Sequence, residues 1–353
     1  GSTNCTTMTK VAYDNLKKYL GIERETRFMM ENFQIVFIDE EVLQILEIDT
    51  RGVHPRPVFF KNMVDDRTYF NEFGIKYHMP EEGLYYDMVE HPLAGKSIEE
   101  LKDYEWPDPA RTMDLSGVRE RAKNLKESNQ YLLVGDMIDT GIFEPCWYLR
   151  GFENFLVDLL TDQDFVTTLL EGMYNYQLKR YSLFLQEAGE FLDVVFVGDD
   201  LATAESVIMS PKTYRDIIKP YHKEYFKNLK KLAPQARLLY HSCGSIFSFI
   251  PDLIEVGVDI LNPVQVSAQN MDTKVLKEKF GRELSFWGAI DTTRVLPRGT
   301  KKEVKEEVRK RIDDLGPEGY ILTSVHDIQP DVPPENVITM FEEARNYGVF
   351  LSH

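Results

Sequence analysis

Short apolar runs alternate with segments of helical periodicity along the second half of the chain. Strands that are covered by helices on both faces are near-continuously apolar, and an alternation of such strands with helices is typical of a parallel sheet. The pattern therefore predicts an α/β protein with strands at residues 191–198, 236–244, 258–265, 284–290 and 319–326.

The helices between these runs carry clear end signals. Thr300 and Glu303 are spaced as a capping box, and Gly316 follows the last apolar position of the same segment. A second helix is predicted between Pro334 and Gly348. Glycine-rich phosphate-binding motifs of the GxGxxG or GxxxxGK[ST] type follow none of the strands, which favours a barrel over an open nucleotide-binding sheet.

The first half of the chain is less regular. We expect helices at 10–22 and 40–48, an antiparallel ribbon from 56–62 and 69–79, and a further barrel strand at 131–137. No internal repeat or flexible linker divides the chain. The interpretation is one domain over residues 1–353, in which 1–110 elaborate a main barrel formed by 111–353.

Charge and cysteine content narrow the class of protein. The net charge of −17, from 41 basic and 58 acidic residues, disfavours nucleic acid and anionic membrane surfaces as partners. Three scattered cysteines make no disulfide framework, and neither a signal pattern nor a long apolar span is visible. We expect a cytoplasmic enzyme, whether Gly1-Ser2 is a tag remnant or native sequence.

The stretch YHSCGSIF, residues 240–247, carries the most specific chemistry. In a strand, residues i and i+2 share a face, so His241 and Cys243 can both point into a barrel mouth. An imidazole with a thiolate suits Zn²⁺, and His326, at the end of another strand, is the candidate third ligand. On spacing alone a strand-end histidine that only bonds to backbone remains the commoner case.

Polar residues end several other predicted strands. Asp199 and Asp200 are candidate catalytic residues; Asn262, Gln265, Trp287 and Asp291 are candidate substrate-binding residues. Each of these carboxylates has helix capping as an alternative role, and capping is the stronger interpretation for Asp291, which precedes two threonines.

Several stretches together resemble the uroporphyrinogen decarboxylase superfamily. They are residues 85–95, 106–111, 198–226, 241–281, 286–300 and 325–337, and they include the Ser210-Pro211 pair and the P-D-x-P-P-E-N-V run at 330–337. The resemblance implies a distorted (β/α)₈ TIM barrel over most of the chain.

The superfamily has two chemical branches. Decarboxylases of the family need no metal and carry an R-Q-A-G-R-type motif, which is missing here. The resemblance of H-x-C-G to the cobamide-dependent methyltransferases implies zinc on His241 and Cys243. At the third position this chain has His326 where those enzymes have cysteine.

The resemblance further implies a methyltransferase with a corrinoid. We expect demethylation of a small O-methyl substrate, with an aromatic methyl ether favoured and aromatic walls from residues 59–62, 85–89 and 285–291. The chain has no D-x-H-x-x-G segment, so the corrinoid is expected on a separate partner protein, and a homodimer is left open. The alternatives are a uroporphyrinogen-type decarboxylase (a lyase), a methylcorrinoid:thiol methyltransferase and a non-enzymatic accessory protein.

Overall fold

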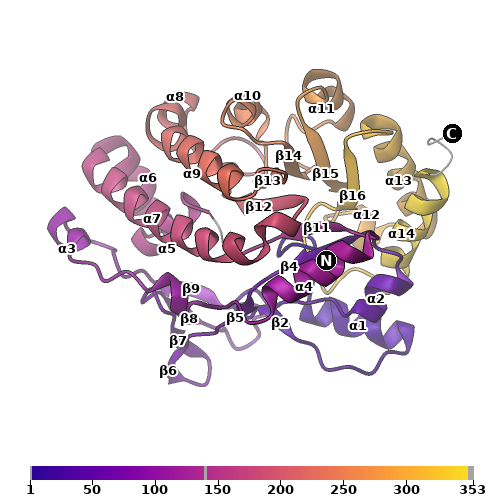
Figure 1. Cartoon of the computed structure of the whole chain (residues 1–353), viewed down its shortest axis with the longest axis horizontal. Coiled ribbons are helices and arrows are strands. Elements are labelled where there is room, and N and C mark those ends of the chain that lie inside the picture. The colour runs from indigo at the N-terminus through magenta and orange to yellow at the C-terminus, as the bar shows by residue number, and fades with distance from the viewer. Residues whose placement is uncertain (1, 139–140, 349–353) are drawn as a thin grey trace.

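A parallel sheet of seven strands forms the centre of the protein, in a computed structural model that describes residues 2–138 and 141–348 (Figure 1). Gly1, whose origin as tag remnant or native sequence was left open above, lies outside the described residues. The strand order is β16-β15-β14-β13-β12-β11-β4. The strands are β4 (Thr50–Val53), β11 (Leu132–Gly135), β12 (Val194–Gly198), β13 (Arg237–His241), β14 (Ile260–Val264), β15 (Ser285–Ile290) and β16 (Tyr320–Ser324).

Helices surround the curled sheet, which confirms the predicted α/β barrel architecture (Figure 1). In the described part of the chain the sheet contains seven hydrogen-bonded strands, against the eight of a complete barrel. The helices that follow the strands are α4 (Val118–Ser128), α6 (Phe152–Thr161), α7 (Gln163–Ala188), α9 (Lys219–Leu232), α10 (Ile250–Glu255), α11 (Thr273–Phe280), α12 (Val295–Arg298), α13 (Lys301–Leu315) and α14 (Pro334–Gly348).

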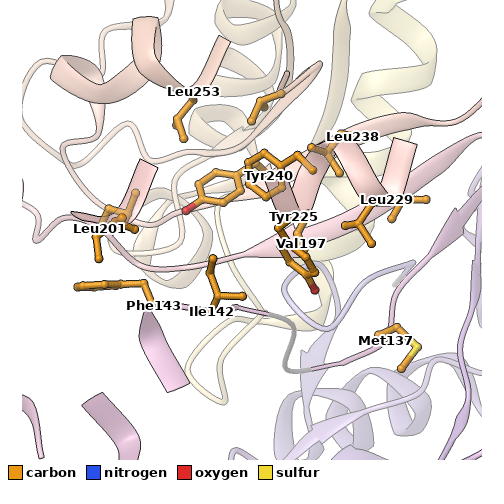
Figure 2. Close-up of a cluster of buried hydrophobic side chains, with 14 of the residues drawn as sticks. Met137, Ile142, Phe143, Val197, Leu201, Tyr225, Leu229, Leu238, Tyr240 and Leu253 are labelled. Atoms are coloured by element: carbon orange, nitrogen blue, oxygen red, sulfur yellow. The ribbon is translucent and has the colours of Figure 1, made fainter. Parts of the chain in front are cut away.

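The largest hydrophobic core lies between the sheet and these helices. Val197 of β12 and Tyr240 of β13 pack with Tyr225 and Leu229 of α9, all of them almost fully buried (Figure 2). The predicted capping box is present at α13, where Thr300 and Glu303 each accept from the other's backbone N–H. Since helix ends and apolar faces agree with the pattern, local sequence determines this half of the fold.

The N-terminal region covers one side of the sheet. Its elements are β1 (Met8–Thr9), α1 (Lys10–Leu20), β2 (Phe28–Met30), β3 (Ile35–Val36), α2 (Glu40–Ile45) and α3 (Ile98–Lys102). The ribbon is an antiparallel sheet of β6 (Asn62–Asp65), β7 (Thr68–Phe70), β8 (Lys76–His78) and β9 (Asp87–Glu90). The predicted single strand at 69–79 is thus two strands joined by a turn, in which the Asn71 side chain accepts from the Ile75 N–H.

A second, smaller core fills the inside of the curled sheet. Phe196, Leu239 and Trp287 pack there against Cys5, which belongs to the segment that precedes α1. This segment is held at its far end by a parallel bridge between Met8 and Ile328. The segment that precedes α1 therefore lies inside the barrel at Cys5 and reaches its edge at Met8, beside the end of β16. Among the described residues no helix is long and apolar enough to cross a membrane.

Candidate metal centre

His241 is the last residue of β13, and its ring is fixed by the strand beside it. The His241 Nδ1 lies 2.6 Å from Oδ1 of Asn262, whose Nδ2 donates to the Trp287 carbonyl at 3.1 Å. Because that carbonyl fixes which end of the amide is oxygen, Nδ1 of His241 carries the proton and Nε2 carries the lone pair. Burial lowers the pKa of His241 to about 4, so the ring is neutral near pH 7. This is how proteins orient a metal-binding histidine.

Cys243 lies in the turn after β13, with Sγ 3.4 Å from Nε2 of His241. Its N–H donates to Oδ1 of Asp200 at 2.7 Å, and the next N–H, of Gly244, donates to Gln265 at 2.7 Å. Gly244 has φ +90°, and a Cβ there would lie 2.4 Å from the Thr203 carbonyl oxygen. The glycine of H-x-C-G is therefore required by the turn that brings the thiol back to the histidine.

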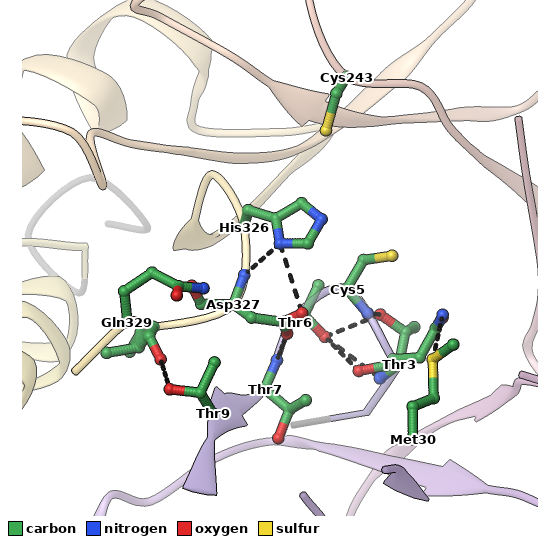
Figure 3. Close-up of polar contacts among 12 residues, drawn as sticks. Thr3, Cys5, Thr6, Thr7, Thr9, Met30, Cys243, His326, Asp327 and Gln329 are labelled. Atoms are coloured by element: carbon green, nitrogen blue, oxygen red, sulfur yellow. Dashed lines mark hydrogen bonds and ion pairs between the residues drawn. The ribbon is translucent and has the colours of Figure 1, made fainter. Parts of the chain in front are cut away.

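His326 follows β16 and faces His241, with the two ring centroids 5.4 Å apart. Its Nδ1 accepts from the Asp327 N–H at 2.8 Å and lies 3.3 Å from Oδ2 of Asp327 (Figure 3). Oδ2 is buried and makes no hydrogen bond to any described residue. Because Nδ1 accepts from the Asp327 N–H, the neutral ring carries its proton on Nε2. If Nε2 bound a metal, the proton would move to Nδ1, which would give up the Asp327 N–H and donate instead to Oδ2, the acceptor that lacks a donor.

The ligand atoms form two groups that share His241. Cys243 and Asp200 lie with His241 in one group, and His326 and Cys5 lie with it in the other. Within each group all ligand atoms are within 4.8 Å of one another. Imidazole nitrogen, thiol sulfur and a carboxylate are the donors that zinc prefers, so the residues fit this metal. The structure thus places the predicted Cys243 and His326 on two sides of His241.

A cavity of about 340 Å³ opens beside His241 and His326. Its polar lining includes Asn4, Cys5, Tyr85, Glu144, Tyr148, Asp200, His241, His326, Asp327 and Gln329. Met30, Pro145 and Tyr148 also line a neighbouring pocket of about 150 Å³, whose walls include Phe60, Tyr69, Phe73, Met137, Met173 and Tyr176. The two pockets therefore adjoin, and these three side chains stand in the wall that they share.

Asp199 has a structural position. Its carboxylate accepts from the N–H groups of Ile142, Phe143 and Glu144, at distances from 2.6 to 3.0 Å, where α5 (Glu144–Arg150) begins. It also pairs with Nε2 of His222 at 3.0 Å. Of the two candidate catalytic residues, only Asp200 lines the cavity.

The four predicted substrate-binding residues lie outside the cavity lining. Asn262 orients His241, and Gln265 holds the Cys243 turn. Trp287 is in the interior core, and Asp291 caps the turn at Thr293 and Arg294. Of the predicted aromatic walls, Phe59, Phe60 and Tyr85 line the pockets, whereas Phe286 and Trp287 are buried in the cores.

Cys5, Glu144 and Asp327 are among the residues of the cavity wall that the sequence-based prediction missed. Burial, reinforced by the Asp200 charge, raises the pKa of Glu144 well above its usual value. Tyr148 donates a hydrogen bond to one oxygen of Glu144, and the Asp200 N–H donates to the other. Glu144 follows a loop without any recognisable motif, so the sequence gives no signal for it. Asp327 directly follows the candidate ligand His326, and this adjacency is a signal from which its role could have been predicted.

The profile described as "Uroporphyrinogen decarboxylase (URO-D)" matches residues 63–347. The chain belongs to the uroporphyrinogen decarboxylase family. Family members with different activities have similar sequence identities to this chain. A methylated-thiol–coenzyme M methyltransferase of Methanosarcina mazei is 22% identical over 222 residues, which are 63% of this chain and 56% of that protein. A uroporphyrinogen decarboxylase of Chlorobium phaeobacteroides is 26% identical over 178 residues, 49% of this chain and 46% of that protein.

A solved structure of this fold covers nearly the whole chain. A methyltransferase from Methanosarcina mazei superposes with a TM-score of 0.66 at 16% identity, over 98% of this chain and 94% of that one. The fold and the family resemblance expected from the motifs are thereby confirmed. In sequence, however, the matched stretches cover only about half of each relative's length, from 46% to 56%.

Proposed function

We propose that this member of the uroporphyrinogen decarboxylase family is a zinc-dependent methyltransferase that demethylates a small O-methyl substrate. The observation that carries the proposal is the pair His241 and Cys243, with the unprotonated Nε2 of the histidine accepting from the thiol at 3.4 Å at the edge of a cavity. Nothing in a metal-free decarboxylation requires an imidazole and a thiol so arranged.

The proposed ligands are His241, Cys243 and His326. A His₂Cys set has one negative charge fewer than a HisCys₂ set, so the bound metal is a stronger Lewis acid. Zinc at this place would polarise an ether oxygen and stabilise the alkoxide or phenoxide that leaves. The chain prepares the site by fixing the His241 tautomer through Asn262 and by leaving Oδ2 of Asp327 free to accept from His326.

The two adjoining pockets support an aromatic methyl ether as the substrate. The aromatic walls Phe60, Phe73 and Tyr176 of one pocket suit a ring, and the adjoining cavity beside His241 would receive its methoxy group. There Asp200 and the hydrogen-bonded pair Glu144 and Tyr148 are in place to orient the oxygen.

In the proposed reaction the substrate's methyl C–O bond breaks and its electron pair stays on the oxygen, which takes up a proton. The methyl group goes to Co(I) of a corrinoid, which supplies the electron pair of the new Co–C bond and becomes formally Co(III). We propose that a separate corrinoid protein carries this acceptor over the barrel mouth and that the reaction is cytoplasmic. The methyltransferase named among the relatives supports the transfer of a methyl group.

A decarboxylase for a tetrapyrrole polyacid is the second candidate, supported by relatives of that name. It needs clustered cations for several carboxylates. Among the described residues no arginine lines the 340 Å³ cavity, whereas Arg56 and Arg180 line the adjoining 150 Å³ pocket. Two other arginines are engaged elsewhere: Arg51 is paired with Glu40 and Arg150 with Asp158. A methylcorrinoid:thiol methyltransferase uses the same ligands and differs in the acceptor.

Metal analysis of the chain prepared without added zinc tests the proposal, alongside Cys243→Ser. We expect about one zinc per wild-type chain. Cys243→Ser should fold, bind zinc more weakly than the wild type, and lose methyl transfer from an aryl methyl ether. Metal-free wild-type protein that decarboxylates a porphyrinogen would establish the second candidate instead. Metal or corrinoid binding without turnover on any donor would favour an accessory protein.

A further inference from the structure

Cys5 lies in the candidate metal centre although it is far in sequence from His241 and His326, the two residues that it meets there. Its Sγ is within 4.8 Å of the ligand nitrogens of both His241 and His326. It is 9% exposed and lines the same cavity as the two imidazoles. Figure 3 shows Cys5 beside His326, with Cys243 above them.

The segment that carries Cys5 is held at several points. The Asn4 N–H donates to Asp136 at 2.6 Å, and the Thr7 N–H donates to Oδ1 of Asp327 at 2.8 Å. Thr9 N–H donates to the Ile328 carbonyl at 3.0 Å. Asp327 thus uses one carboxylate oxygen to position the Cys5 segment and presents the other to His326. The cysteine and the histidine are therefore fixed relative to each other by one buried side chain.

Two buried polar atoms in this wall have no hydrogen-bond partner among the described residues: Oδ1 of Asn4 and Oδ2 of Asp327. Asn4 is 8% exposed and Asp327 is 2% exposed, and both line the cavity. Buried polar atoms are normally satisfied, so their presence indicates a wall built to meet a polar ligand or a metal with its ligands.

Cys5 could instead be only a small apolar residue of the interior core, since it packs with Phe196, Leu239 and Trp287. That role explains its burial. It does not explain a sulfur placed beside two imidazoles at the cavity surface, with an unsatisfied carboxylate oxygen behind one of them.

We propose that Cys5 is a thiolate ligand of the same metal and holds the cavity-side position in the substrate-free protein. This rests on the proposed function, because it requires metal at His241. The N-terminal segment then supplies a sulfur that the strand-end motifs do not reveal. Together with Cys243 it gives the centre two thiolates while no substrate is bound; the ether oxygen takes the place of Cys5 when substrate binds, which leaves the His₂Cys set of the proposed reaction.

Counting the sulfur ligands tests the inference. The full chain is loaded with Zn²⁺ for X-ray absorption at the metal edge, and with Co²⁺ for thiolate-to-cobalt charge-transfer absorption. We expect two sulfurs in the wild type and one each in Cys5→Ala and Cys243→Ser, with the charge-transfer intensity halved. Zinc affinity should fall at least about 10- to 100-fold in Cys5→Ala, the range for weaker perturbations of metal sites.

The buried Cys146, whose thiol donates to the Ile142 carbonyl, provides the matched control. Cys146→Ser should keep two sulfurs and wild-type zinc affinity. If Cys5→Ala unfolds, Cys5→Ser is measured in its place. Loss of one sulfur from Cys243→Ser but none from either Cys5 variant overturns the inference and leaves the proposed zinc site standing. A wild type that binds no metal overturns both.

Discussion

Replacing Asn262 by alanine should weaken metal binding without removing a ligand. Asn262 is fully buried, and its amide makes two hydrogen bonds: it accepts from His241 Nδ1 at 2.6 Å and donates to the Trp287 carbonyl at 3.1 Å. The alanine leaves both partners buried and unsatisfied. Each such group costs about 1–3 kcal/mol, so the free energy of unfolding of the metal-free protein should fall by about 2–6 kcal/mol.

The effect on the metal is separate from this loss of stability. Without the acceptor the imidazole can adopt the other tautomer or turn, and the loss of such a partner typically lowers metal affinity about 10- to 100-fold, or about 1.4–2.7 kcal/mol. A chelator competition gives the zinc affinity, and urea unfolding of metal-free protein gives the stability.

Asn336→Ala is the matched control. Asn336 is also a buried asparagine, and it donates to the carbonyls of Leu296 and Gly299 at 2.8 and 2.9 Å, remote from the centre. It should lower stability by a similar amount and leave zinc affinity unchanged. The role given to Asn262 is refuted if both variants bind zinc as tightly as the wild type.

Four further outcomes are expected. Asp199→Ala should lower the free energy of unfolding by about 3–5 kcal/mol, because it leaves three buried N–H groups and His222 without their hydrogen-bond acceptor. The zinc content of the folded fraction should not change. Gly244→Ala should cost about 1–3 kcal/mol and release zinc at a lower chelator concentration, because of its φ of +90° and the Thr203 carbonyl. Burial raises the pKa of Asp136 from 3.8 to about 7, so between these pH values the folded protein binds a proton that the unfolded chain has lost. Relative to Asp136→Asn, the free energy of unfolding of the wild type, measured in urea, should therefore fall by at most about 4 kcal/mol as pH rises from about 4 to 7. A difference between the two proteins that does not change with pH would contradict the pKa shift. Phe60→Ala, at an exposed pocket wall, should raise KM for an aryl methyl ether while Tm stays within a few degrees.

The parallel half of the fold was predictable because its strands and helices have local signals. The five apolar runs correspond to β12 to β16, and the Thr300–Glu303 box begins α13. The strand β4, with the sequence Thr-Arg-Gly-Val, escaped prediction because Arg51 and Gly52 interrupt its two strand formers and its place depends on pairing with β11. An edge strand whose position depends on pairing with a distant strand is not predicted by its own sequence pattern.

The candidate site, too, combines residues that the sequence predicts with residues that only long-range contacts bring together. His241 and Cys243 are two residues apart at a strand end, so their proximity follows from local geometry. The functions expected of Asn262 and Gln265 changed, because which strand-end side chain enters the cavity and which supports its neighbour depends on packing between strands. Cys5 could not be found from sequence, since the path of its segment is set by contacts with Asp136 and Asp327 far along the chain.

A single-turnover assay tests the central claim most directly. The zinc-loaded protein is mixed anaerobically with free cob(I)alamin and an aryl methyl ether, and the conversion of Co(I) to methyl-Co(III) is followed by its absorption spectrum. The account predicts methylcobalamin and one demethylated phenol per methyl transferred, with loss of the reaction after zinc removal and in Cys243→Ser. Equal methyl transfer by the zinc-loaded and the zinc-free protein would contradict it.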